Sequence, residues 1–248
     1  MSPPPVSALA AATDAIGTTG AAVDPGNYRY VKLWHLPIRL MHWTAALAVV
    51  VLFWTGMYLG RPYFMGALSG SFVVQYARLV HFIAAGVLVA TAVVRFYWLF
   101  VGNRYERWGA LFPYGRRDWK DMWMMLRYYL FIHPEQAPKY LGHNPFQQIG
   151  YTLTYLVAAV MALTGFLLFG QSNPNGWMMQ TIGWLTPLLG GNQTIRLVHH
   201  ALPWYFPVFA IIHVYMAVRH DSVERTGTIS SMVGGGRFVR VGERYVDD

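Results

Sequence analysis

Apolar stretches without Asp, Glu, Lys or Arg dominate this 248-residue sequence. The first covers residues 40–60, about 21 residues, which is long enough for a helix to cross the hydrocarbon core of a bilayer. The second, residues 79–99, is interrupted only by Arg95 near its far end, from where a long side chain reaches the membrane surface. The third, residues 140–195, is too long for one helix and contains the turn-forming sequence Gln-Ser-Asn-Pro-Asn-Gly at 171–176.

These breaks divide the apolar sequence into four predicted membrane spans, at about residues 40–60, 78–100, 148–170 and 196–218. The fourth span contains Pro203 and Pro207, and proline is tolerated in membrane helices as a kink when neighbouring groups satisfy the freed carbonyls. We therefore expect an all-α membrane protein, with a four-transmembrane-helix bundle within residues 28–220.

Polar segments flank and separate the spans. Residues 1–27 are rich in Ala, Pro, Thr and Gly and contain no Lys or Arg, which predicts a disordered N-terminal segment and not a secretory signal. Between the second and third spans, large apolar residues recur at helical spacing within residues 118–133 and predict an interfacial amphipathic helix. They are Trp119, Met122, Trp123, Leu126 and Leu130. Residues 221–248 are expected to form a C-terminal tail.

The composition excludes several classes of protein. With 55% hydrophobic and only 12% charged residues, the chain is too apolar for an ordinary soluble domain. It contains no Cys, which removes disulfide frameworks, iron–sulfur clusters, thioether-attached haem and thiolate zinc sites. The net charge of +8 does not indicate nucleic-acid binding, because the positive charges flank apolar stretches instead of forming a basic face on a soluble fold.

The distribution of Lys and Arg predicts the orientation in the membrane. About 15 of them fall in the N-terminal segment, the loop after the second span and the C-terminal tail, all on one side. The other side has only Arg61, Arg78 and Arg196. By the positive-inside rule, both termini are expected in the cytoplasm.

Four histidines lie within the predicted spans, where ionisable residues are rare and suggest function. They are His42, His81, His199 and His213. Taken singly, each is as consistent with an interhelical hydrogen bond as with a metal ligand. The predicted topology, however, places His42 and His213 near the cytoplasmic face, and His81 and His199 near the outer face. Two histidine pairs are therefore expected at two levels of one bundle.

Paired imidazoles without a third protein ligand favour one kind of metal centre. Two imidazoles leave most of the coordination shell of a zinc or copper ion unfilled. Haem iron, whose macrocycle fills four positions, needs only two axial ligands. The sequence therefore predicts two non-covalent b haems, an outer one held by His81 and His199 and an inner one held by His42 and His213.

The arginines and glycines near these histidines can each be interpreted in two ways. Arg39, Arg78 and Arg196 stand three residues before a histidine, one helical turn towards the interface, and are candidates to pair with haem propionates. Basic residues also commonly flank the ends of membrane helices. Similarly, three glycines within the spans either allow a flat ring to approach the backbone or allow close helix packing. They are Gly56, Gly86 and Gly165.

Several motifs resemble those of a known family. Residues 37–43 read Pro-Ile-Arg-Leu-Met-His-Trp, and the same motif closes at Thr55-Gly56. A second motif comprises His199-His200, Trp204, Phe209 and His213. Further landmarks lie at residues 102–104, 142–145 and 229–233. Over about residues 30–240, the chain resembles the b-type cytochrome subunit of membrane-bound nickel–iron hydrogenases. It departs from the family pattern at Met41, where Trp is frequent, and at His200, where Arg is frequent.

This resemblance implies a function. It implies a two-haem subunit of a bacterial inner membrane that takes electrons from the small and large subunits of a periplasmic hydrogenase and delivers them to membrane quinone. The chain would not itself activate hydrogen, because nickel in those enzymes needs thiolates and the sequence has no Cys. Two alternatives stay open: the cytochrome subunit of a formate dehydrogenase or related reductase, and a haem-free membrane anchor or transporter.

A quinone site is expected near the inner haem, with His143 and Asn144 in or beside it. Quinone reduction consumes protons and needs a donor or relay close to the carbonyl oxygens and open to water. His143 precedes the third span on the cytoplasmic side, at the level of the inner histidine pair. In the alternative reading, His143 and Asn144 cap or brace the start of the third helix.

Overall fold

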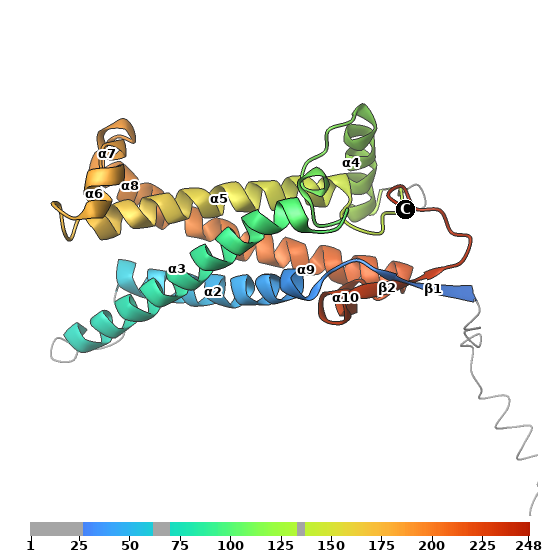
Figure 1. The fold of residues 1–248 in the computed structure, drawn as a ribbon, viewed down its shortest axis with the longest axis horizontal. Helices are drawn as coiled ribbons and strands as arrows, with labels where there is room; N and C mark the ends of the chain where they lie inside the picture. The colour runs from blue at the N-terminus through green and yellow to red at the C-terminus, as the bar shows by residue number, and fades with distance from the viewer. Residues whose placement is uncertain (1–26, 62–69, 133–136) are drawn as a thin grey trace, which may run out of the picture.

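The computed structural model describes residues 27–61, 70–132 and 137–248. Most of the segment predicted to be disordered, residues 1–27, lies outside this part of the chain. Within it, four helical segments are long and apolar enough to cross a membrane, and they run side by side along the long axis (Figure 1). They are α2 (Leu36–Gly60), α3 (Gly70–Val101), α5 (Pro145–Gly170), and α8 (Gly191–Ala201) continued by α9 (Tyr205–Glu224). The predicted all-α membrane protein with four spanning helices is confirmed.

Local sequence sets where these helices begin. Pro37 stands in the first turn of α2, where its missing N–H is not needed. Asn144 caps α5: its side chain accepts a hydrogen bond from the backbone N–H of Gln147, and the Gln147 side chain accepts from the Asn144 backbone N–H. The helices begin a few residues earlier than the hydropathy pattern predicts, because these polar and proline residues belong to the first helical turns.

The fourth span is broken and not merely kinked. A 3-10 turn at Leu202–Trp204 separates α8 from α9. Pro203 lies within it and lacks the N–H that a continuous α-helix would use. Pro207, the other proline of this span, lies in the first turn of α9. The apolar segment also extends over Gly191–Glu224, beyond the predicted bounds of 196–218. His199 and His213 therefore lie on two separate helices.

The amphipathic helix between the second and third spans is present as α4 (Arg116–Tyr129). Its inner face buries Met125, Tyr128 and Tyr129, which pack against Met216 of α9. The outer face leaves Trp119 and Trp123 about half exposed, as expected for aromatic residues at a membrane interface.

A small sheet joins the two ends of the described chain. Strand β1 (Tyr28–Lys32) pairs antiparallel with β2 (Gly236–Arg240), in a register that sets Tyr30 opposite Phe238. These strands were not predicted from the sequence. Helix α10 (Thr228–Gly234) precedes β2, so part of the expected tail is folded against the bundle. Both ends consequently lie at the same end of the molecule (Figure 1).

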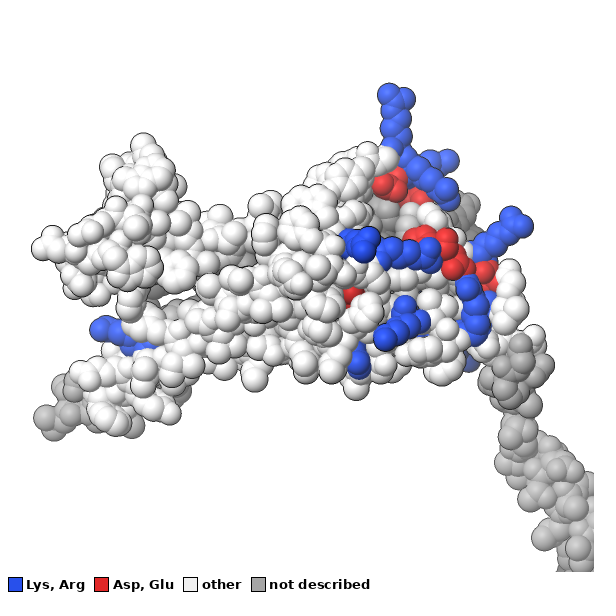
Figure 2. All heavy atoms as spheres, in the orientation of Figure 1, with Lys and Arg blue, Asp and Glu red and all other residues white. Residues whose placement is uncertain are grey.

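Charged residues are concentrated at this end. Figure 2 shows most Lys, Arg, Asp and Glu side chains of the visible face around α4 and the two strands. The opposite end, which holds α6 (Trp177–Ile182) and α7 (Leu185–Leu188), carries few of them. The charge asymmetry in the sequence is thus an asymmetry between the two ends of the bundle.

A buried carboxylate ties the start of α2 to the end of α3. Glu106 is 1% exposed and accepts hydrogen bonds from the His35 backbone N–H at 2.6 Å and the His35 ring Nδ1 at 2.8 Å. It also accepts from Trp98 Nε1 at 3.0 Å and the Asn103 backbone N–H at 3.1 Å. Burial alone would raise the pKa of Glu106, but these donors together lower it below its usual value.

Candidate haem sites

The inner histidine pair joins α2 to α9. The rings of His42 and His213 lie 6.2 Å apart between centroids, with an interplanar angle of 48°. A metal ion bound at about 2.0–2.1 Å by one nitrogen of each ring would hold the centroids about 6 Å apart. His42 Nδ1 is buried and has no hydrogen-bond partner among the described residues. The observed separation therefore matches that expected for a single metal ion held between the two rings.

Aromatic rings surround His213. Phe209 stacks on it at 5.5 Å and 12°, and Tyr205 stacks on Phe209 at 5.8 Å. Tyr151 of α5 meets His213 edge-on at 6.0 Å. Because these neighbours are large and rigid, they restrict the orientation of the imidazole.

The first histidine of the outer pair, His81 on α3, is held by α2. Its Nδ1 lies 2.8 Å from the Thr55 hydroxyl oxygen, and that hydroxyl lies 2.7 Å from the Val51 carbonyl. The carbonyl can only accept, so the hydroxyl donates to it and receives the Nδ1–H of His81. Gly56 follows Thr55, and a Cβ there would meet His81 Cε1 at 3.3 Å.

The second histidine, His199 on α8, is held by α5 in the same way. Its Nδ1 lies 2.9 Å from the Thr164 hydroxyl oxygen, which is 2.7 Å from the Val160 carbonyl. A Cβ added at the following Gly165 would meet His199 Cε1 at 3.2 Å. A Thr-Gly pair from a neighbouring helix therefore positions each histidine of the outer pair.

The hydrogen bonds of the outer pair select the imidazole tautomer that can bind a metal ion. His81 and His199 lie close enough for the charge of one ring to affect the other. Because Nδ1 of each ring carries the proton, Nε2 is left as an unprotonated ligand atom. Within the described ranges, no three His, Asp or Glu side chains come together as a zinc site requires. Two imidazoles with glycine opposite them fit a haem, which needs two axial ligands and space for a flat ring.

The three arginines proposed to contact propionates differ in their surroundings. Arg39 donates to the Val233 carbonyl of α10, and its Nε is buried without a partner among the described residues. Arg78 and Arg196 are exposed. Arg95 of α3, expected from the sequence only to reach the membrane surface, donates to the Tyr155 hydroxyl at 3.2 Å and the Glu106 carbonyl at 3.0 Å.

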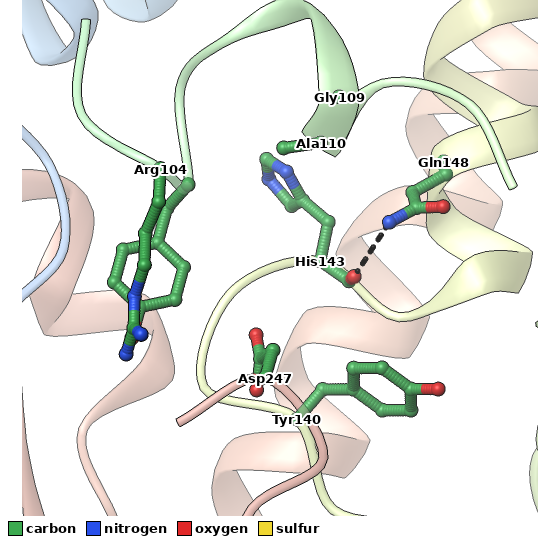
Figure 3. Close-up of a pocket in the computed structure, with 8 residues that line it drawn as sticks. Arg104, Gly109, Ala110, Tyr140, His143, Gln148 and Asp247 are labelled. Atoms are coloured by element: carbon green, nitrogen blue, oxygen red, sulfur yellow. Dashed lines mark hydrogen bonds between the residues drawn. The ribbon is translucent and has the colours of Figure 1, made fainter. Parts of the chain in front are cut away.

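His143 lines a small cavity of about 170 Å³ at the charged end of the bundle (Figure 3). Its ring stacks on Trp34 at 4.8 Å and meets Tyr151 edge-on at 4.6 Å. Burial, and next the nearby Arg95, lower the pKa of His143 to about 3, and its Nδ1 has no partner among the described residues. The cavity lining comprises Arg104, Tyr105, Gly109, Ala110, Tyr140, His143, Gln148 and Asp247.

Asn144 has a different environment from His143. Its side chain caps α5, donates to the Tyr129 hydroxyl at 3.2 Å and is 2% exposed. It does not line the cavity. Gln148, one turn further along α5, does line it, and its side-chain amide donates to the His143 carbonyl at 3.2 Å (Figure 3).

Comparison with known proteins identifies the family. Residues 33–235 match the family described as prokaryotic cytochrome b561. The chain belongs to this family. A probable Ni/Fe-hydrogenase B-type cytochrome subunit of Azotobacter vinelandii is 40% identical over 216 residues, covering 85% of this chain and 89% of the relative. A protein of the same description from Cupriavidus necator is 36% identical, covering 90% of this chain and 94% of the relative. The probable Ni/Fe-hydrogenase 1 B-type cytochrome subunit of Escherichia coli K12 is 34% identical, covering 84% of this chain and 90% of the relative. The resemblance stated from the motifs is confirmed.

Membership of this family makes the chain a multi-pass membrane protein and a b-type cytochrome that transfers electrons. Several residues that shape its candidate haem sites carried no assigned role in the sequence analysis, chief among them Thr55, Thr164 and Tyr151. Two of these had a detectable signal, because Thr55 and Thr164 are each followed by glycine in the outer half of a span. Their contacts with histidines on other helices required the three-dimensional structure.

Proposed function

We propose that this cytochrome is the membrane subunit of a nickel–iron hydrogenase, carrying electrons from hydrogenase small and large subunits on the periplasmic side to membrane quinone. The relatives from Azotobacter, Cupriavidus and Escherichia coli are named as subunits of such enzymes. The observation that carries the proposal is the pairing of imidazoles inside the bundle, above all the 6.2 Å separation of the His42 and His213 rings. No observation favours a formate dehydrogenase or a haem-free transporter.

Two b haems would be held by the two histidine pairs. His81 and His199 would bind the outer one, and His42 and His213 the inner one. Haem bound by two histidines supplies one-electron transfer without an open coordination position for substrate. Arg39, and by sequence position Arg78 and Arg196, would pair with the propionates through charge-assisted hydrogen bonds.

The protein's own contribution to such sites is to fix and shield the ligands. Thr55 and Thr164 hold the Nδ1–H of their histidines, and Gly56 and Gly165 leave the space next to the rings free. Phe209, stacked on His213, excludes water on the inner side. Rings that are already oriented need little rearrangement when the iron changes oxidation state.

Quinone would react at the cavity lined by His143. A cavity of about 150 Å³ is known to accept one benzene ring, so the 170 Å³ found here suits a quinone headgroup. Tyr151 lies between the rings of His143 and His213, which connects the cavity to the inner pair. With its pKa lowered to about 3, His143 is neutral at physiological pH and would donate a ring N–H to a quinone oxygen and relay protons from the cytoplasm.

The orientation proposed is an inner-membrane protein with both termini in the cytoplasm. Pairing of β1 with β2 supports the placement of both ends on one side. The concentration of Lys and Arg around those strands supports that side being the cytoplasm (Figure 2). The His143 cavity would then open towards the side from which protons are taken.

The function is tested by purifying the chain with its partners from native membranes. We expect nickel-containing hydrogenase subunits to copurify, the b haems to be reduced by hydrogen, and a water-soluble quinone analogue to reoxidise them. Copurification with a molybdenum- or tungsten-containing enzyme, with haem reduction by formate, would overturn the hydrogenase assignment. Absence of a Soret band would overturn the function as a cytochrome.

A further inference from the structure

The two histidine pairs differ in what their Nδ1 atoms contact. Both histidines of the outer pair bond to a threonine hydroxyl, His81 to Thr55 at 2.8 Å and His199 to Thr164 at 2.9 Å. In the inner pair, His42 Nδ1 is buried without a hydrogen-bond partner among the described residues, and the His213 ring is stacked on Phe209. An inference from this difference rests on the proposed function, because it assumes that each pair binds a b haem.

The direction of the threonine hydrogen bonds follows from their second partners. Each hydroxyl has one proton, and each lies 2.7 Å from a backbone carbonyl four residues earlier, Val51 or Val160. Donation to that carbonyl leaves the oxygen lone pairs to accept from the imidazole. Each outer histidine is therefore fixed with Nδ1 protonated and Nε2 available for iron.

Such a hydrogen bond also changes the ligand electronically. An acceptor on the Nδ1–H increases electron density on the ring and makes Nε2 a more basic ligand. A more basic ligand stabilises iron(III) relative to iron(II) and so lowers the reduction potential of the haem. His42, whose Nδ1 has no such acceptor among the described residues, would be a less basic ligand than His81 or His199.

We propose that Thr55 and Thr164 are positioning residues that orient His81 and His199 towards the outer haem and make it the haem of lower potential. Electrons that enter at the outer side would then move downhill to the inner pair, next to the His143 cavity. The Thr-Gly pair carries both functions at once, because the hydroxyl holds the imidazole and the following glycine gives it space.

The test is a redox titration of the purified holoprotein, followed by its visible and electron paramagnetic resonance spectra. The variants Thr55→Val, Thr164→Val and the double variant remove the hydroxyl and keep the shape. The redox transition that is absent from the titration of His199→Ala belongs to the outer haem. We expect its iron(III)/iron(II) equilibrium to shift about tenfold towards iron(II) in the double variant, which is about 59 mV for one electron, and we expect the transition of the inner haem to be unchanged.

Two controls separate this role from a general structural one. Thr91→Val removes a hydroxyl on α3 that also bonds to a carbonyl four residues earlier, Val87, but contacts no histidine, and it should leave both potentials unchanged. Thr164→Ser keeps a hydroxyl and should keep the wild-type potential. If the valine variants lose the outer haem and the serine variant keeps it at the original potential, the hydroxyl is needed to position the histidines, and the wild-type titration must then show the outer haem at the lower potential for the proposal to stand.

Other outcomes overturn it. Both haems retained with unchanged potentials in the double variant would show that the hydroxyls do not tune the outer site. A fall in the outer potential would contradict the electronic argument, and loss of haem in Thr164→Ser would show that something other than the hydroxyl is needed. A wild-type protein with no outer haem would instead contradict the proposed function. Failure of the proposed function is thereby distinguished from failure of the threonine proposal.

Discussion

The rings of His42 and His213 face each other across the bundle with 6.2 Å between their centroids. They come from the first and last spanning segments, α2 and α9, so the pair forms only when the whole chain has folded. Phe209 and Tyr151 hold the His213 side of the pair in place. The site is therefore preorganised, and its formation is coupled to the assembly of the bundle.

Substitution of the glycines opposite the outer histidines is expected to perturb the outer haem. In Gly165→Ala, the new methyl group would lie 3.2 Å from His199 Cε1, and in Gly56→Ala 3.3 Å from His81 Cε1. Both rings would have to move by a few tenths of an ångström, which loosens their alignment. We expect reduced outer-haem content or an altered low-spin signal, measured by haemochrome assay and electron paramagnetic resonance.

Gly86→Ala is the matched control for this experiment. It lies five residues after His81 on α3, about 140° around the helix, and a Cβ there meets no described atom within 4 Å. It should leave both haem signals unchanged. Equal effects of all three substitutions would indicate helix packing instead of a contact with the histidines.

Loss of the Glu106 charge should destabilise the protein. Glu106→Gln keeps the size of the side chain but weakens the hydrogen bonds from His35, Trp98 and Asn103, at a cost of about 2 kcal/mol. Thermal unfolding in detergent, followed by tryptophan fluorescence, measures the change. Glu243→Gln, at an ion pair with Lys139 near the surface, should cost at most about 1 kcal/mol.

The same residue predicts a pH dependence. The folded protein holds the pKa of Glu106 below its ordinary value of 4.5, so its stabilising contribution is complete above that value. It is lost as the pH falls through the lower, folded-state pKa. The stability difference between wild type and Glu106→Gln should therefore be constant near neutral pH and shrink in acid. A difference that instead grows in acid would contradict the direction of the pKa shift.

Removal of the His143 ring should slow quinone reduction without affecting the haems. Because the ring lines the cavity and is not one of the four proposed ligands, His143→Ala should keep both haem spectra and their reduction by hydrogen. Stopped-flow reoxidation by a quinone analogue should slow by about 10²–10⁴-fold if the ring transfers protons. Normal turnover would remove His143 from the mechanism, and loss of haem would favour a bracing role.

Topology can be measured without background labelling because the chain has no Cys. Val241, beyond β2, is 59% exposed, and Asn175, between α5 and α6, is exposed at the opposite end. A membrane-impermeant thiol reagent added to spheroplasts should label Asn175→Cys and not Val241→Cys. The reverse result would invert the proposed orientation.

Much of the fold was predictable from hydropathy alone. Charge-free stretches of membrane length identified the four spans, and apolar residues at helical spacing identified α4. The break between α8 and α9 was not predicted as a break, because a proline inside an apolar stretch is compatible with either a kink or a 3-10 turn. Strands β1 and β2 were missed because they are far apart in the sequence and each needs the other to form.

The candidate histidines could be identified from the sequence, but the residues that hold them in place could not. The histidines were detectable because an ionisable residue inside a span is unusual. Thr55 and Thr164 were not assigned a role, since a threonine in a membrane helix commonly bonds only to its own backbone, as Thr91 does. Asn144 shows the opposite case: its capping of α5 was an alternative reading in the sequence, and the helix start bears that geometry out.

The proposed function requires two histidine pairs that bind two b haems in one chain, and the haem-to-chain ratio measures this. A pyridine haemochrome assay on the purified protein should give two haems per chain for the wild type and about one for His199→Ala. His200→Ala, which removes the adjacent imidazole packed against Gly60, should keep two. A wild-type ratio of one, or the loss of one haem in His200→Ala but not in His199→Ala, would contradict the account.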